Sequence, residues 1–174
     1  MATRDTAIAI RYVEGDATEP IGSGQKIIVH VCNDIGKWGK GFVLAVSRRW
    51  KEPERVYRES FRGTDRPSPG DVQFVRVSEL STVANLIGQH GISAGVDGLP
   101  PVRYEALRAG LSKVAAQARA EEASVHMPRI GCGLAGGQWA RVEEIVMETL
   151  VSKGVDVTVY DYIAARQGAA TEAH

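Results

Sequence analysis

The chain has 174 residues, with 21 basic and 21 acidic side chains and a hydrophobic fraction of 44%. This length fits one domain with its own core, and a net charge of zero argues against a general nucleic-acid or membrane-surface binder. Cys32 and Cys132 form no C-x-x-C pair, so we expect reduced thiols in a cytoplasmic protein. No apolar run predicts a signal peptide or a membrane span.

The order of apolar patterns along the chain predicts an α/β fold. Runs rich in β-branched residues predict strands and apolar residues at helical spacing predict helices. In chain order these are strands at Ile8–Val13 and Lys26–Cys32, helices at Phe42–Trp50 and Glu52–Phe61, strands at Val72–Val77 and Thr82–Ile87, a helix at Tyr104–Glu122, a strand at Ser124–Ile130, a helix at Trp139–Ser152 and a strand at Val155–Tyr160.

Such alternation implies a three-layer α/β/α domain around a mixed, mostly parallel central sheet. We expect residues 1–163 to form this single domain, residues 164–174 to be a disordered tail, and the protein to be a monomer.

Two glycine-bearing loops each follow a predicted strand and precede a predicted helix. Glycines in this setting let an anion approach backbone N–H groups at a helix start. Because carboxyl ends of parallel strands share one edge, we expect both loops to face one crevice and to clamp a diphosphate. A tight turn without a ligand is the alternative, although one turn needs only one or two glycines. The glycines are Gly36, Gly39 and Gly41 in the first loop, and Gly131, Gly133, Gly136 and Gly137 in the second.

Other nucleotide and metal sites fit the sequence less well. Gly131–Gly136 has the G-x-G-x-x-G spacing of dinucleotide-binding folds, with Asp161 at the end of the next predicted strand. That fingerprint normally opens its fold, whereas only about 38 residues follow here, so no dehydrogenase is predicted. The absence of Gly-Lys-Ser/Thr excludes a P-loop. The histidines lack ligand-like spacing, so we expect no metal and no cofactor.

Three motifs together resemble the macrodomain family, whose members bind ADP-ribose. The third motif is most similar to the branch that includes the terminal ADP-ribose protein glycohydrolase and the macrodomain of a related chromatin remodeller. The resemblance runs from Ile8 to Tyr162 and implies the macrodomain fold. The motifs are Val13-Glu14-Gly15-Asp16-Ala17-Thr18, then His30-Val31-Cys32-Asn33-Asp34 with Gly39-x-Gly41-Phe42, and Met127-Pro128-Arg129-Ile130-Gly131-Cys132-Gly133-Leu134.

The resemblance implies a role for each motif. Asp16, between Gly15 and Ala17, would accept a hydrogen bond from the adenine amino group, unless it only caps a turn. Tyr160 and Tyr162 would border the adenine, unless they belong to the core or the rim. Outside the motifs, and not implied by the resemblance, Arg103 is a candidate to pair with a phosphate, unless it only starts a solvated helix face, and Tyr104 is a candidate to pack over the ribose. The distal ribose would lie against Gly39, Gly41 and Phe42, and the diphosphate against Gly131, Cys132, Gly133, Leu134, Ala135 and Gly136.

Catalysis is a separate question, because two family residues are replaced. The glycohydrolase of this branch uses a lysine after the strand matching Thr82–Ile87 and an aspartate after Gly-Cys-Gly-Leu. Gln89 and Ala135 stand at those positions, so we do not expect a lysyl intermediate.

An ester between ADP-ribose and a Glu or Asp side chain loses a carboxylate of pKa about 4, which needs no strong general acid. We therefore expect hydrolysis of such esters on ADP-ribosylated proteins. Asn33 would orient the ribose, Asp34 would activate water, and Gln89 would hold the water or the ribose. Asp34 can instead close an Asx-turn. The alternatives are a non-catalytic module that binds ADP-ribose and its protein conjugates, and a deacetylase of O-acetyl-ADP-ribose.

Overall fold

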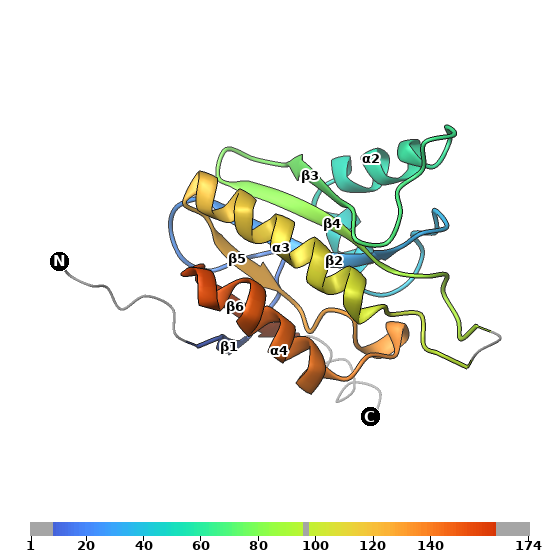
Figure 1. Cartoon of the computed structure of the whole chain (residues 1–174). Helices are drawn as coiled ribbons and strands as arrows, with labels where there is room; N and C mark the ends of the chain where they lie inside the picture. Colours follow the sequence, from blue (N-terminus) through green and yellow to red (C-terminus); the bar gives the residue numbers. More distant parts are fainter. Residues whose placement is uncertain (1–8, 96–97, 163–174) are drawn as a thin grey trace, which may run out of the picture.

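The computed structural model describes residues 9–95 and 98–162. They form three layers, a six-stranded sheet between two layers of helices (Figure 1). The strand order is β1-β6-β5-β2-β4-β3; β3 is antiparallel to β4 and the other described pairs are parallel, which confirms the predicted mixed sheet. The elements are β1 (Arg11–Glu14), β2 (Lys26–Asn33), α1 (Phe42–Arg49), α2 (Glu52–Ser60), β3 (Val72–Arg76), β4 (Ser81–Gln89), α3 (Tyr104–Glu121), β5 (Ser124–Met127), the 3₁₀ turn η1 (Gly133–Ala135), α4 (Trp139–Thr149), the 3₁₀ turn η2 (Val151–Lys153) and β6 (Val157–Asp161).

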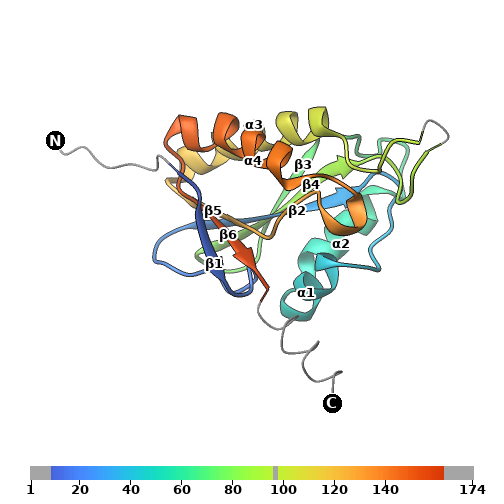
Figure 2. The same ribbon diagram turned by 90° about the horizontal axis from the view of Figure 1, so that it is seen from below.

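The central strands are covered on both faces, which explains their almost continuous apolar sequence. Successive side chains of a strand point to opposite faces. On β2, Ile27 and Val29 belong to the core beneath α3 and α4, whereas Ile28 and Cys32 belong to the core beneath α1 and α2. Figure 2 shows these two helix pairs on opposite sides of the sheet. No helix among the described residues is long and apolar enough to cross a bilayer.

Helix α3 packs closely against β4 through a glycine. Its predicted apolar stripe is confirmed, since Leu107, Leu111 and Val114 are fully buried. A Cβ atom built on Gly110 would lie 2.5 Å from Cγ of Leu86, so a larger residue would push the helix off the strand. This close contact fixes the start of α3 near the carboxyl end of β4.

Some element ends differ from the prediction for local reasons. β5 stops at Met127 rather than Ile130, because Pro128 has no N–H group to donate to a neighbouring strand. α4 stops at Thr149 rather than Ser152, and η2 follows it and closes at Gly154 with φ of 82°. β1 begins at Arg11 rather than Ile8. Ile8 and the tail predicted at 164–174 lie outside the described residues.

Two histidines are buried in the sheet. His30 on β2 is 1% exposed and pairs through Nε2 with Asn85 Oδ1 at 2.6 Å. His126 on β5 is 2% exposed and lies between the Ser124 hydroxyl at 2.8 Å and the Tyr160 hydroxyl at 2.7 Å. Burial lowers the pKa of both rings to about 4; the bond to Asn85 opposes this shift for His30, whereas nearby cations add to it for His126.

Acidification should therefore destabilise the fold before most carboxylates titrate. An unfolded histidine titrates near pH 6.5, so between about pH 6.5 and pH 4 the unfolded chain binds more protons than the folded one. The free energy of unfolding should be constant above pH 6.5 and fall by up to about 1.4 kcal/mol per pH unit for each histidine below it. Urea unfolding at steps between pH 7 and pH 5 measures this slope, and His126→Gln should reduce it. An unchanged slope in that variant would contradict the assignment.

Candidate functional site

Three joined chambers form a groove along the carboxyl ends of the parallel strands. The first, of about 230 Å³, lies between Gly15–Ala17 and Tyr160. It shares Gly41, Phe42 and Pro128 with a middle chamber of about 340 Å³, which is lined by residues 128–135. The middle chamber continues into a third, of about 450 Å³, through five shared residues: Val31, Lys40, Val43, Gln89 and Leu134. The predicted crevice between the two glycine-bearing loops is thus present.

The first chamber contains a carboxylate and an aromatic wall. Asp16 Oδ1 accepts hydrogen bonds from the Thr18 amide at 2.8 Å and the Thr18 hydroxyl at 2.7 Å, so this oxygen does cap a turn. Among the described residues, Oδ2 of Asp16 has no hydrogen-bond partner. The Tyr160 ring is buried, and its hydroxyl is fixed by His126 and by the Ile21 amide. Tyr160 is therefore both a core residue and a wall of the chamber.

A buried amide shapes loop one, residues 34–41. Asn33 Oδ1 accepts hydrogen bonds from the amides of Ile35 and Lys37 and from the Tyr57 hydroxyl, at 3.0, 3.1 and 2.7 Å. Its Nδ2 donates to the Lys37 carbonyl at 2.7 Å. Asn33 lines the third chamber, but its side chain is already engaged in holding the loop.

The end of β4 is fixed beside loop one. A register shift after Cys32 leaves Gly88 without an opposite residue in β2 and sets Gln89 opposite Asn33. The Gly88 carbonyl accepts from the Arg103 amide instead. Gln89 lines the middle and third chambers and donates through Nε2 to the Gly91 carbonyl at 3.2 Å. Asp34 accepts from the Gly91 amide and pairs with His90 Nδ1, each at 2.8 Å. Asp34 thus joins loop one to the segment after β4, rather than closing an Asx-turn, and it lies outside the lining of the three chambers.

The backbone amides of loop two, residues 131–137, fall into two groups: those bonded within the loop and those without a protein acceptor. The amides of Ala135, Gly136 and Gly137 are bonded to carbonyls within the loop. In the described part of the chain, the amides of residues 131–134 donate to no protein acceptor. Those four amides, rather than all seven, belong to residues that line the middle chamber and have no partner among the described residues.

Most glycines of loop two are required by the loop's own packing. A Cβ on Gly137 would lie 2.3 Å from the Gly131 carbonyl oxygen, and one on Gly136 would lie 2.8 Å from Pro100. Gly131 has φ of 77°, and a Cβ there would lie 3.2 Å from side-chain atoms of both Leu107 and Val102. At Gly133 a Cβ would meet no atom within 4 Å, although its φ of 64° still favours glycine. The packing of the loop therefore accounts for several of these glycines without a ligand.

Two cations line the middle chamber. Arg129 forms a bidentate pair with Asp161, at 2.7 and 3.1 Å, and lies over the rings of Tyr12 and Trp139. This hydrogen-bonded pair lowers the pKa of Asp161. Lys40 has no ion-pair partner among the described residues. No carboxylate lines the chamber, so its charge suits an anion.

Cys132 also lines the middle chamber, but as a neutral thiol. Partial burial raises its pKa, an effect that the charge of Arg129 opposes. Nucleophilic chemistry is therefore not expected of it.

Two predicted site residues line none of the three chambers. The Arg103 guanidinium donates to the Pro100 carbonyl. The Tyr104 hydroxyl accepts from the amide of Gln138, the residue after loop two, at 2.9 Å, and the Arg141 guanidinium stacks 3.9 Å over its ring. Both side chains are thus engaged by protein groups. By contrast Gly39, Gly41, Phe42, Gly131, Gly133 and Leu134 do line the groove. Gly136, which was predicted to contact the diphosphate, lines none of the three chambers and lies against Pro100.

The structure adds four cations that the sequence reasoning did not select. Arg48 lines the first chamber, Arg129 and Lys40 the middle one, and Lys37 and Lys40 the third. Arg129 stands inside a motif that was already singled out, so the motif itself was the available signal. The lysines lie between the glycines of loop one, where charge alone does not distinguish a ligand contact from a solvated side chain.

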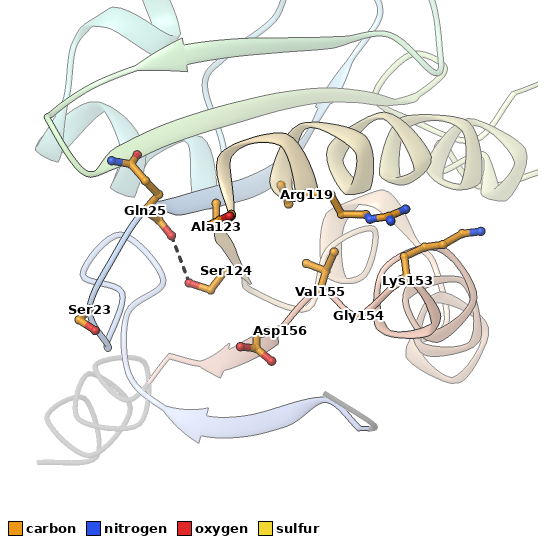
Figure 3. Close-up of a pocket in the computed structure, with 11 residues that line it drawn as sticks. Ser23, Gln25, Arg119, Ala123, Ser124, Lys153, Gly154, Val155 and Asp156 are labelled. Atoms are coloured by element: carbon orange, nitrogen blue, oxygen red, sulfur yellow. Dashed lines mark hydrogen bonds between the residues drawn. The ribbon is translucent and has the colours of Figure 1, made fainter. Parts of the chain in front are cut away.

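A separate hollow of about 410 Å³ lies at the opposite edge of the sheet (Figure 3). It is lined by residues before β2 and β6, the first residue of β5 and the end of α3, including Arg119, Lys153 and Asp156. In open α/β sheets ligands bind at the carboxyl ends of the strands. The groove is therefore the candidate site.

These features define a class: an α/β/α domain whose ligand groove crosses the carboxyl ends of its parallel strands. A macrodomain protein from Streptomyces coelicolor is 53% identical to the chain, with a TM-score of 0.77, and the match covers 88% of this chain and 99% of that one. The chain belongs to the macrodomain family, as its motifs indicated.

Other comparisons agree with this assignment. A Bacteroides thetaiotaomicron protein of unknown function is 57% identical, with a TM-score of 0.87, over 89% of this chain and 99% of that one. Chromodomain-helicase-DNA-binding protein 1-like from Mus musculus is 32% identical over 161 residues, which cover 87% of this chain. The chain spans only 18% of the length of that curated relative.

A more distant likeness is one of fold alone. Thermosipho africanus DarTG, solved in complex with ADP-ribose, is 17% identical, with a TM-score of 0.65, over 80% of this chain and 39% of that one. No family model matches the chain.

Replacing Asn33 should loosen loop one. Asn33→Ala would leave two amides and a carbonyl without their partner and would remove one of the two acceptors of the buried Tyr57 hydroxyl. It should lower the free energy of unfolding by about 1–3 kcal/mol. Tyr57→Phe removes one of these donors and should have a smaller effect. Thermal and urea unfolding measure both changes. Equal stability of Asn33→Ala and the wild type would contradict the role given to this amide.

Proposed function

We propose that the groove binds ADP-ribose, with adenine in the first chamber, the diphosphate in the middle chamber and the distal ribose in the third. The observation that carries this proposal is the order of chemistry along one groove: a carboxylate at one end, then unpaired amides and cations. ADP-ribose presents an amino-bearing base, two phosphates and a neutral sugar in the same order. The ADP-ribose complex of DarTG, which shares the fold, supports the proposal.

Asp16 would select adenine. Its Oδ1 holds the turn at Thr18, which leaves Oδ2 to accept from the exocyclic amine of the base. A base with a carbonyl at that position would instead face a carboxylate oxygen without a proton between them. Tyr160 and Phe42, which line the same chamber, supply aromatic and apolar surface for the ring.

The diphosphate would lie against the amides of residues 131–134. Four N–H groups that face no protein acceptor match the many acceptor oxygens of a diphosphate. Lys40 adds an unpaired positive charge on the loop-one side. Arg129 is already paired with Asp161, so we expect it to contribute less to affinity.

The variant Asp16→Asn separates recognition of adenine from formation of the turn. It keeps an oxygen for Thr18 but turns the second acceptor into a donor. ADP-ribose affinity should fall roughly 10- to 100-fold, because a hydrogen bond to a charged group contributes about 1.5–3 kcal/mol, while the thermal midpoint should change little. Calorimetry measures the affinity, and an ADP-ribose analogue with hypoxanthine for adenine is the matched ligand control. Absence of ADP-ribose binding to the wild type at millimolar ligand would refute the proposed function.

A second candidate function is hydrolysis of esters that link ADP-ribose to Glu or Asp side chains of proteins. The observation that favours it is Gln89, which is held by Gly91 and lines the chamber assigned to the distal ribose. We place the chain near the glycohydrolase branch on Met127–Leu134, but without the lysine and aspartate of that branch. Its route would therefore use water rather than a lysine.

In this route Gln89 holds the attacking water. Asp34 lies outside the chambers and would act indirectly, because it accepts from the Gly91 amide while the Gly91 carbonyl accepts from Gln89 Nε2. Asn33 keeps loop one in place beside the ribose. If the water route is absent, the same groove remains a module that binds ADP-ribose conjugates without cleaving them; removal of an acetyl group from O-acetyl-ADP-ribose is the remaining alternative.

Incubation with a peptide that carries ester-linked ADP-ribose on a glutamate tests the second candidate. Free ADP-ribose should be released faster than in buffer, and Gln89→Ala should lower the rate by about 100-fold, because the water is no longer positioned. The affinity for ADP-ribose should change far less. A release rate equal to that in buffer, in a protein that binds ADP-ribose, would exclude this hydrolysis and leave the binding module and the deacetylase.

A further inference from the structure

The third chamber is larger and more positively charged than a ribose requires. Its volume is about 450 Å³, against about 230 Å³ for the first chamber. Ribose and adenine have nearly the same number of non-hydrogen atoms, so the third chamber has room for more than the sugar. On the proposed function, that spare volume lies where the ADP-ribose would be attached to a modified protein.

Two lysines line this chamber and no carboxylate does. Lys40 also lines the middle chamber, where the diphosphate accounts for its charge. Lys37 lines only the third, and neither lysine has an ion-pair partner among the described residues. The nearest carboxylate along the chain, Asp34, is bonded to His90 and to the Gly91 amide instead. Lys37 is therefore a positive charge that a neutral ribose does not explain.

Apolar side chains flank the same chamber. Ile92 is 50% exposed and Leu134 is 69% exposed, and both line it. They approach from the segment after β4 and from loop two, on either side of the groove. Exposed apolar side chains next to a binding groove are typical of a surface that contacts a macromolecule. A small phosphorylated ligand offers no apolar surface to contact Ile92 and Leu134, whereas a polypeptide does.

We propose that the third chamber and its rim recognise an acidic polypeptide segment around the ADP-ribosylated residue. Lys37 attracts carboxylates that flank the modified side chain, and Ile92 and Leu134 contact apolar parts of the segment. The inference rests on the proposed binding of ADP-ribose and adds its substrate class: conjugates on acidic stretches of protein. Since the charges are exposed, Lys37 contributes selectivity and encounter rate more than affinity.

Calorimetry with three ligands tests this inference. The ligands are free ADP-ribose and two peptides that carry ADP-ribose through a stable amide link, one flanked by glutamates and the other by glutamines. At low salt the glutamate conjugate should bind up to about fivefold more tightly than the glutamine conjugate for each lysine engaged. High salt should remove this advantage.

Lys37→Ala should abolish the advantage and retain the affinity for free ADP-ribose, and Lys37→Glu should reverse the preference between the two conjugates. Lys153→Ala is the matched control, because Lys153 is an exposed lysine in the hollow at the opposite edge of the sheet (Figure 3). It should change none of the three affinities.

The outcomes separate this inference from the proposed function. Equal affinity for the two conjugates, with free ADP-ribose bound, would overturn the inference alone. A fourth ligand, ADP-ribose with a phosphate on its distal ribose, tests the alternative. If the affinity gained from Lys37 is larger for this ligand than for the glutamate conjugate, the chamber is a phosphate subsite and the inference is overturned. Failure of free ADP-ribose to bind would overturn both.

Discussion

The groove depends on one buried side-chain amide at the end of β2. Asn33 holds the amides of Ile35 and Lys37 and the Lys37 carbonyl, and is itself held by Tyr57 from α2. Loop one then continues into Gly39–Val43, residues of which line each of the three chambers. Burial of a side-chain amide without hydrogen-bond partners would be strongly unfavourable. Because the hydrogen bonds of Asn33 form in this arrangement of the loop, they favour a single conformation of loop one. The shape of the site is therefore set by the protein before any ligand arrives.

Other polar side chains near the groove are also held by hydrogen bonds within the protein. Asp34 joins loop one to the segment after β4, and Tyr160 is held by His126 and the Ile21 amide. Among the described residues, the groups around the groove without a hydrogen-bond or ion-pair partner include the amides of residues 131–134, Asp16 Oδ2 and the side chains of Lys37 and Lys40. A ligand that binds there need not reorganise the wall, which reduces the entropy lost on binding. Charge is also separated along the groove, although the whole chain has a net charge of zero.

A glycine in a loop between a strand and a helix can be required by close packing of the loop or by the approach of a ligand. The sequence alone does not distinguish these two causes. Gly137 and Gly136 are small because the Gly131 carbonyl and Pro100 approach them, and Gly133 alone among these opens onto empty space. The packing of the loop thus accounts for Gly136 and Gly137, and that these glycines admit a ligand stays a prediction. The last three amides of the loop are bonded internally, and the proposed anion site uses the other four.

The sequence by itself determined the layer order, the buried helix faces and the family, because apolar periodicity and short glycine motifs are local properties of the chain. Pro128 even explains where β5 ends. Only the tertiary structure decided which polar side chains reach the groove. Arg103 bonds to the Pro100 carbonyl, Tyr104 to the Gln138 amide and Asp34 to the Gly91 amide, whereas Lys37 and Arg48 line the chambers. The direction of such a side chain is set by partners distant in sequence, such as Pro100 for Arg103 or Tyr57 for Asn33, and no local pattern encodes those contacts.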